Sequence, residues 1–172
     1  LWHAPDGFYY DHDLSGRFSS VKAVSCFLPL LLDNIPSSRV DRLVEHLDDP
    51  GTFAAPFPVP SVALDHPAWS TDMWRGATWT NMNYLIITGL RKHGRLVEAK
   101  RLVRAPVDHV ERYYRQFGVL FEFYDARDEV PPTQCHRKGP VPRQYDLRQK
   151  MSSIRDYHWT AALTARLLLD RA

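Results

Sequence analysis

The sequence has 172 residues and a mass of 19.9 kDa, with 44% hydrophobic, 12% aromatic and 24% charged residues, which is typical of one globular domain and excludes a disordered or collagen-like chain. The 22 Lys and Arg residues against 20 Asp and Glu give a net charge of only +2, and they are dispersed, so neither nucleic acid nor an anionic membrane is expected as a partner. No apolar run reaches the roughly 20 residues of a membrane span and no signal peptide opens the chain, which favours a soluble, cytoplasmic protein.

Five segments carry helical patterns, and two long loops separate them. Helices are predicted at residues 21–32, 36–47, 80–93, 95–116 and 159–171. The loops cover residues 48–71 and 118–156, both rich in proline, and loops of this length in a compact domain usually carry function. Short extended pieces are expected at most at residues 7–11 and 119–124, so the predicted fold class is all-α with long loops.

Two tryptophans, an arginine and two asparagines precede and enter the third predicted helix, in the segment Asp72 to Tyr84. Indole faces stack on sugar rings, and Arg and Asn side chains bind hydroxyl groups or anions. This pattern leaves two interpretations open. Either Trp74 and Trp79 form part of a sugar site with Arg75, or they fill the core while Arg75 pairs with a carboxylate.

A carboxylate stands between aromatic residues in Phe121-Glu-Phe-Tyr-Asp125. Either Glu122 lies exposed on a strand that alternates faces, or it is held in a partly apolar pocket, where it would suit general acid or base catalysis. The mixed charge run from Arg137 to Arg148 is interpreted as a solvated loop surface.

No metal or cofactor is expected from the remaining polar residues. Cys26 and Cys135 are isolated and predicted to be free thiols, and His158 lacks a partner at metal-ligand spacing. The acidic residues Asp6, Asp11 and Asp13 lack the ligand pattern of a calcium loop. A solvated turn is the simpler interpretation of those three residues.

Four segments, taken in order, resemble the C-terminal half of the catalytic domain of glycoside hydrolase family 63. They are Leu1-Trp-His-Ala-Pro-Asp-Gly-Phe-Tyr-Tyr-Asp11, Trp74-Arg-Gly-Ala-Thr-Trp-Thr-Asn-Met-Asn-Tyr84, Phe121-Glu-Phe-Tyr-Asp125 and Tyr157-His-Trp-Thr-Ala-Ala-Leu163. That family and the family 37 trehalases share an (α/α)6 barrel of six helical hairpins. The resemblance implies that residues 1–172 are the C-terminal portion of one such barrel domain, a partial toroid and a fragment.

The resemblance also implies roles for individual residues. The positions that match the sugar pocket are Trp74, Arg75, Gly76, Trp79, Asn83 and Trp159. Glu122 matches the general base of an inverting hydrolysis, which needs a second carboxyl group about 6.5 to 9.5 Å away as the general acid. The aspartate that serves as this acid belongs to an earlier part of the barrel. We therefore expect the acid, and the N-terminal half of the barrel, to lie outside this chain, and the chain alone to be inactive.

The resulting hypothesis is an inverting α-glycoside hydrolase that acts on a small α-glucoside or α-mannoside without a cofactor. A trehalase, or a phosphorylase in which inorganic phosphate replaces the base, is an alternative on the same barrel. An alternative from a different class is a noncatalytic helical domain that binds carbohydrate through Trp74, Trp79 and Trp159, with Glu122 merely structural.

Overall fold

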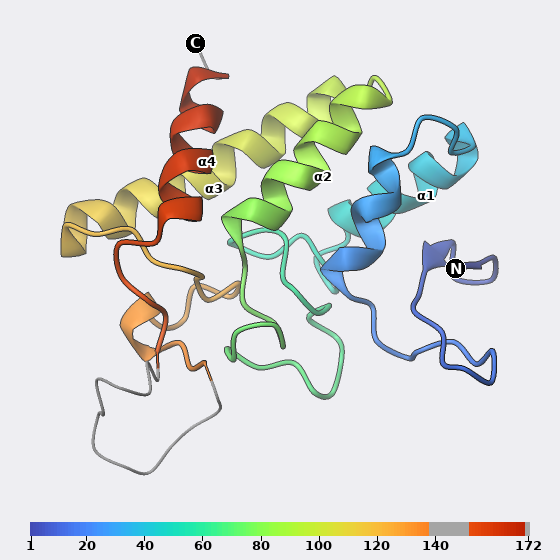
Figure 1. The fold of residues 1–172 in the computed structure, drawn as a ribbon, viewed down its shortest axis with the longest axis horizontal. Helices are drawn as coiled ribbons and strands as arrows, with labels where there is room; N and C mark the ends of the chain where they lie inside the picture. Colours follow the sequence, from blue (N-terminus) through green and yellow to red (C-terminus); the bar gives the residue numbers. More distant parts are fainter. Residues whose placement is uncertain (138–151, 171–172) are drawn as a thin grey trace.

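A computed structural model describes residues 1–137 and 152–170, which fold mainly into helices joined by long loops (Figure 1). The elements in chain order are β1 (Trp2–His3), β2 (Phe8–Tyr9), the 3-10 helix η1 (Val24–Leu31), α1 (Ser37–Asp48), α2 (Thr80–Lys92), α3 (Leu96–Phe117), the 3-10 helix η2 (Pro132–Gln134) and α4 (His158–Leu169). All five predicted helical segments are helical. The mostly helical fold is therefore confirmed.

The first predicted helix differs in type and in length from its prediction. It is a 3-10 helix that begins at Val24 rather than at residue 21. The amide of Val24 donates to the carbonyl of Ser61 at 3.0 Å, and the amide of Ala63 donates to Lys22 at 3.0 Å. These bonds hold the preceding residues extended, and Pro29 has no N–H to donate inside the helix, so a regular α-helix does not form.

The two strands form an antiparallel hairpin that closes one end of the core. Trp2 pairs with Tyr9 and His3 with Phe8. The ring of Phe8 is fully buried and stacks at 5.8 Å on Phe53, which comes from the first long loop. The aromatic residues of that loop therefore pack into the core, and the loop is ordered.

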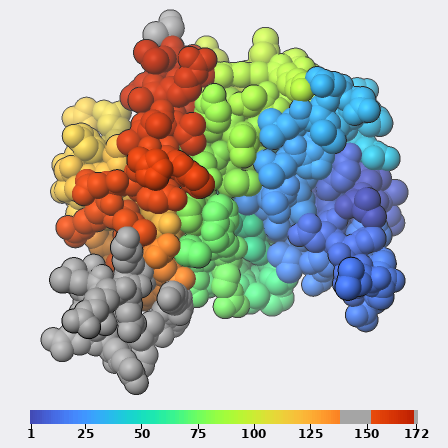
Figure 2. Space-filling model, in the orientation of Figure 1, coloured from blue at the N-terminus to red at the C-terminus, as the bar shows by residue number. Residues whose placement is uncertain are grey.

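α2 is the central helix of the molecule. It contacts η1, α3 and α4, and on the face shown in Figure 2 the residues of α4 lie against those of α2. Its buried apolar side chains are Met82, Ile86, Ile87 and Leu90. Gly89 allows η1 to approach, because a Cβ added there would lie only 2.6 Å from the Cβ of Leu30.

α3 leads the chain from the core to the second long loop. It runs through Pro106 and ends at Phe117. Gly118 caps it in the left-handed conformation, with φ 70°, and donates its amide to the carbonyl of Tyr114 at 2.8 Å. Residues 49–79 and 118–137 then lie together at the end of the molecule where α2 and α4 begin (Figure 1). The helices thus present the two predicted functional loops on one side.

Both cysteines are free thiols, as predicted. Cys26 and Cys135 are buried, and burial raises the pKa of the Cys135 thiol to about 12. Within the described part of the chain, no helix is long and apolar enough to cross a membrane.

Replacing Gly89 with alanine tests the close packing of α2 on η1. Alanine favours an exposed helix by about 1 kcal/mol over glycine, but here the new methyl group meets Leu30. We expect Gly89→Ala to lower the free energy of unfolding by about 1–3 kcal/mol, as overpacking does. Urea denaturation measures this change. The control is Thr88→Ala on the exposed side of the same helix; a Gly89→Ala protein as stable as this control would contradict the packing argument.

Candidate active site

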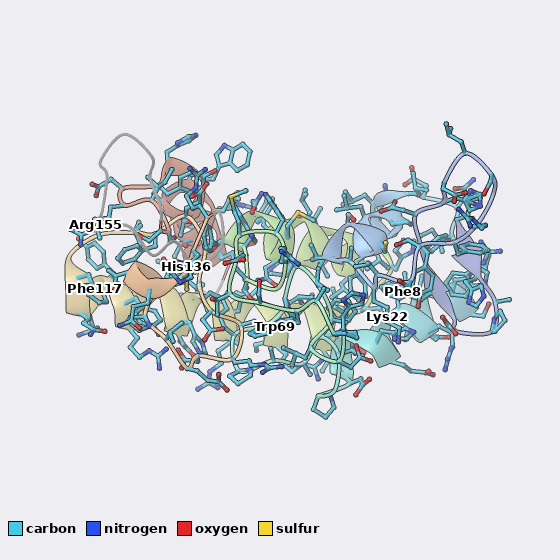
Figure 3. The ribbon with its side chains drawn as sticks, turned by 90° about the horizontal axis from the view of Figure 1, so that it is seen from below. Phe8, Lys22, Trp69, Phe117, His136 and Arg155 are labelled. Carbon is cyan, nitrogen blue, oxygen red and sulfur yellow. The ribbon has the colours of Figure 1, made fainter. Side chains whose placement is uncertain are left out.

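Short extended segments bring the predicted site residues together. The amide of Thr78 donates to Tyr124 at 2.8 Å and the amide of Tyr124 donates to Thr78 at 3.1 Å, as in an antiparallel bridge. Phe121 forms a second bridge with Arg155. The segment that leads into α2 therefore lies beside the Glu122 segment, which lies beside the residues that lead into α4. Figure 3 looks onto these loops from below, with His136 and Arg155 labelled.

Trp74 and Trp79 form a stacked pair. Their ring centroids are 3.9 Å apart and their planes differ by 4°. Trp79 is 3% exposed and packs against Phe123, whereas Trp74 is 42% exposed. The sequence left two interpretations open for these tryptophans, core packing and an accessible site. Trp79 is packed in the core, whereas Trp74 presents its indole to solvent.

Met73 anchors this pair through its backbone. Its carbonyl accepts a bond from the indole Nε1 of Trp79 at 2.9 Å, and its amide donates to the carbonyl of His136 at 2.9 Å. Its φ of 28° lies in the positive range that residues other than glycine rarely adopt. Strain of this kind, of the order of 1–3 kcal/mol, collects at functional sites where the surrounding bonds enforce it.

Gly76 and Arg75 differ in their access to solvent. Gly76 is buried, and a Cβ added there would lie 2.4 Å from the carbonyl oxygen of Ser70 and 2.5 Å from the indole nitrogen of Trp69. The glycine is therefore required for packing. Arg75 is exposed, and within the described residues its side chain has no hydrogen bond or ion pair, so its guanidinium is available to a ligand.

Asn83 has a structural position rather than the predicted place in the sugar pocket. Its side chain is fully buried in α2. The amide oxygen accepts from the amide of Val59 at 3.1 Å, and the amide nitrogen donates to the carbonyl of Pro58 at 2.6 Å. Because both polar atoms already bind the first long loop, Asn83 positions that loop and is not accessible to a sugar.

Glu122 is 4% exposed, between the fully buried rings of Phe121 and Phe123. The interpretation of this residue as a surface carboxylate is therefore wrong, and the pocket interpretation fits. The Nε atom of Arg137 lies 3.0 Å from Oε2, but this contact is not aligned as a hydrogen bond. Within the described residues, buried Oε2 has no hydrogen-bond donor.

Three hydrogen bonds to Ser153 and Ile154 fix the backbone that carries this carboxylate. The amide of Glu122 donates to Ile154 at 2.9 Å. The hydroxyl of Ser153 accepts from the amide of Phe123 at 3.0 Å and donates to its carbonyl at 2.8 Å. Ser153 was not predicted as a site residue, because nothing in its local sequence indicates that it pairs with a residue in a different loop.

The interpretation of the charge run 137–148 as a solvated surface is wrong for Arg137. Its side chain is only 23% exposed and pairs with Glu122, fifteen residues earlier in the chain. Residues 138–148 lie outside the described part of the chain. A charge run by itself contains no signal for one partner at such a separation, so this site residue was missed.

Asp125 holds the turn that follows the Glu122 segment. The buried carboxylate accepts three backbone amides, those of Arg127 at 3.1 Å, Glu129 at 2.8 Å and Val130 at 3.1 Å. An aspartate that caps the following backbone is a recognisable turn signal, so this role could have been found from the sequence.

Trp159 lies in the first turn of α4 and is 48% exposed. Its ring is 6.0 Å from that of Tyr157. Burial and the charge of Glu122 raise the pKa of Tyr157, so this phenol stays protonated near the carboxylate. Tyr157 is thus near both Glu122 and Trp159.

The arrangement combines the exposed indole of Trp74, the guanidinium of Arg75, which has no partner among the described residues, and the buried carboxylate of Glu122. These groups suit the binding of a sugar and general base chemistry. In residues 1–137 and 152–170, no three His, Cys, Asp or Glu side chains are placed to share a metal ion.

Comparison with known proteins places this chain in a glycoside hydrolase family. Residues 1–160 match the mannosylglycerate hydrolase MGH1-like glycoside hydrolase domain. The mannosylglycerate hydrolase of Thermus thermophilus is 32% identical over 114 residues, 65% of this chain and 27% of the relative. That of Rubrobacter radiotolerans is 30% identical over 175 residues, 99% of this chain and 34% of the relative. The chain thus spans about a third of the length of the curated relatives it matches.

Solved structures show the same relation. The family 63 mannosylglycerate hydrolase of Thermus thermophilus in complex with Tris has a TM-score of 0.71 at 26% identity, over 95% of this chain and 34% of that one. The glucose complex of the family 63 enzyme has a TM-score of 0.63 at 28% identity, over 73% of this chain and 31% of that one. Neutral trehalase Nth1 of Saccharomyces cerevisiae, at 16% identity and TM-score 0.72 over 98% of this chain and 27% of that one, is similar in fold alone. The helices therefore match part of the (α/α)6 barrel of these enzymes.

Removing the Asp125 carboxylate tests its role as the anchor of the turn. Hydrogen bonds to charged groups contribute about 1.5–3 kcal/mol each, and three amides lose their acceptor. We expect Asp125→Ala to lower the free energy of unfolding by at least about 2 kcal/mol, with Asp125→Asn intermediate. Denaturant titration measures both, and Asp65→Ala, at an exposed aspartate, is the control. An effect no larger than that of the control would show that the turn does not depend on this carboxylate.

Proposed function

Because the chain belongs to the mannosylglycerate hydrolase MGH1-like glycoside hydrolase family, we propose that it supplies the general base and part of the sugar pocket of an inverting α-glycoside hydrolase. The proposed substrate is a small α-mannoside or α-glucoside. Two curated relatives named mannosylglycerate hydrolase and a related structure in complex with glucose support this class of substrate.

The observation that carries the proposal is the buried carboxylate of Glu122. A buried polar atom without a donor is costly, yet Oε2 has no donor within the described residues. In the proposed mechanism, Glu122 activates the water molecule that attacks the sugar. As this water attacks the anomeric carbon, its proton passes to Glu122, and attack from the face opposite the leaving group inverts the configuration.

The exposed indole of Trp74 provides the platform for the sugar. Trp79 covers one of its faces at 3.9 Å, which holds the indole in place. The apolar face of a pyranose ring stacks on such a surface, while the free guanidinium of Arg75 donates to hydroxyl oxygens. Trp159, at the start of α4, forms a further wall of the pocket.

The general acid and further helices of the barrel come from outside this chain in our proposal. α3 and α4 enclose an apolar groove of about 420 Å³. Its apolar lining residues include Val107, Val110, Tyr114, Ala161 and Leu168. A groove of this kind is suited to packing against another helix. The relatives, which are about two and a half to three times as long, have additional chain.

Glu122→Gln in the intact protein that contains these residues tests the base. The amide keeps the shape of the side chain but cannot accept the proton of water, so kcat should fall by about 100-fold or more while sugar affinity stays nearly unchanged. Proton NMR of the products from a panel of α-mannosides and α-glucosides should show the β-anomer first for the unmodified enzyme.

Glu129→Gln, at an exposed glutamate of the same loop, is the matched control and should leave kcat unchanged. Equal losses of binding and turnover in Glu122→Gln would make Glu122 a binding or folding residue. Activity that depends strictly on inorganic phosphate would identify a phosphorylase instead.

Trp74→Ala tests the stacking platform. Aromatic stacking is worth about 0.5–1.5 kcal/mol, so KM should rise about 2- to 10-fold, with Trp74→Phe less affected. Phe18→Ala is the control, because Phe18 is similarly exposed at 41% and lies in the N-terminal part of the chain. If the two alanine variants have the same KM as the unmodified enzyme, Trp74 does not contact the substrate.

A further inference from the structure

Both side chains of the ion pair between Arg137 and Glu122 are largely buried. The exposed fractions are 23% for Arg137 and 4% for Glu122. A surface pair is screened by water and contributes little, whereas a pair removed from water interacts strongly and leaves a costly unpaired charge when one partner is lost. Arg137 therefore has a large effect on the carboxylate it faces.

The guanidinium meets the carboxylate side-on and loosely. Nη2 of Arg137 donates to Oε1 of Glu122 at 3.4 Å, and Nε lies 3.0 Å from Oε2 without hydrogen-bond alignment. A tight bidentate fork would occupy both carboxylate oxygens. Here the positive charge lies against the whole carboxylate, and within the described residues Oε2 has no aligned hydrogen bond.

The backbone next to Arg137 is tied to both sides of the site. The carbonyl of His136 accepts the amide of Met73 at 2.9 Å, next to Trp74, and the carbonyl of Cys135 accepts the amide of Ser153 at 3.0 Å. Ser153 in turn binds the backbone beside Glu122. The guanidinium is thus held by the same loops that position the indole and the carboxylate.

We propose that Arg137 is a positioning residue for Glu122: its guanidinium offsets the cost of keeping the carboxylate away from water and fixes the carboxylate plane, while the carboxylate accepts the proton of the attacking water. This inference rests on the proposed function of Glu122 as the base. Within the described residues the Tyr157 phenol also interacts with Glu122: burial and the carboxylate raise its pKa, and the Arg137 charge lowers it. This phenol stays neutral, so the positive charge beside Glu122 comes from Arg137.

Kinetics of Arg137→Gln and Arg137→Lys in the intact enzyme test the inference. Replacing a residue that orients a functional group typically lowers activity about 10- to 100-fold. We therefore expect Arg137→Gln to lower kcat by this amount, with KM nearly unchanged. Arg137→Lys should recover part of the loss, because it restores the charge but not the planar fork.

Added ethylguanidinium should increase kcat of Arg137→Ala. Arg155→Gln, at an exposed arginine bridged to the neighbouring residue Phe121, is the control and should match the unmodified enzyme.

Three outcomes would overturn the inference. If Arg137→Gln retains full kcat while Glu122→Gln is inactive, Arg137 does not position the base although the proposed function stands. If Arg137→Gln raises KM and leaves kcat unchanged, Arg137 binds substrate instead. If all Arg137 variants lose activity together with their thermal transition, and ethylguanidinium does not restore it, Arg137 is a folding residue. An active Glu122→Gln enzyme would refute the proposed function itself.

Discussion

The paired backbone bonds between Thr78 and Tyr124 are the contact on which the arrangement of the site depends. They join the residues that lead into α2 to the segment of Glu122. Both residues are fully buried, so water does not compete for these bonds, and the hydroxyl of Thr78 adds a bond to Phe57 at 2.7 Å. Two loops that are far apart in the sequence are therefore held at a fixed separation, one with the indoles and the other with the carboxylate.

The buried polar groups around this bridge fall into two kinds. Asn83 and Asp125 use their side chains to satisfy the backbone of the two loops. Burial of such groups is tolerated because each polar atom has a partner. Glu122 is different, because Oε2 has a nearby positive charge but no donor within the described residues. This contrast distinguishes the residues that hold the two loops from the residue that we propose as the base.

Much of the helical framework could be predicted, whereas part of the site could not. The stripe of Val40, Leu43 and Leu47 identified α1 because a helix repeats every 3.6 residues whatever surrounds it. The type of η1 was not predictable in this way, since it follows from bonds to residues 61–63. Motif resemblance indicated Glu122, but it also selected Asn83, whose role depends on the loop packed against it.

The sequence by itself determined most helix positions, the resemblance to glycoside hydrolase family 63 and the candidate base, because helical periodicity and the order of motifs depend only on which residue types follow one another along the chain. Only the tertiary structure decided that Glu122 is buried, that Trp74 rather than Trp79 is exposed, and that Arg137 faces the carboxylate. Burial and pairing depend on which distant segments meet. The long loops of this chain meet through backbone bonds, which any residue except proline can donate, so residue identity alone does not specify these contacts.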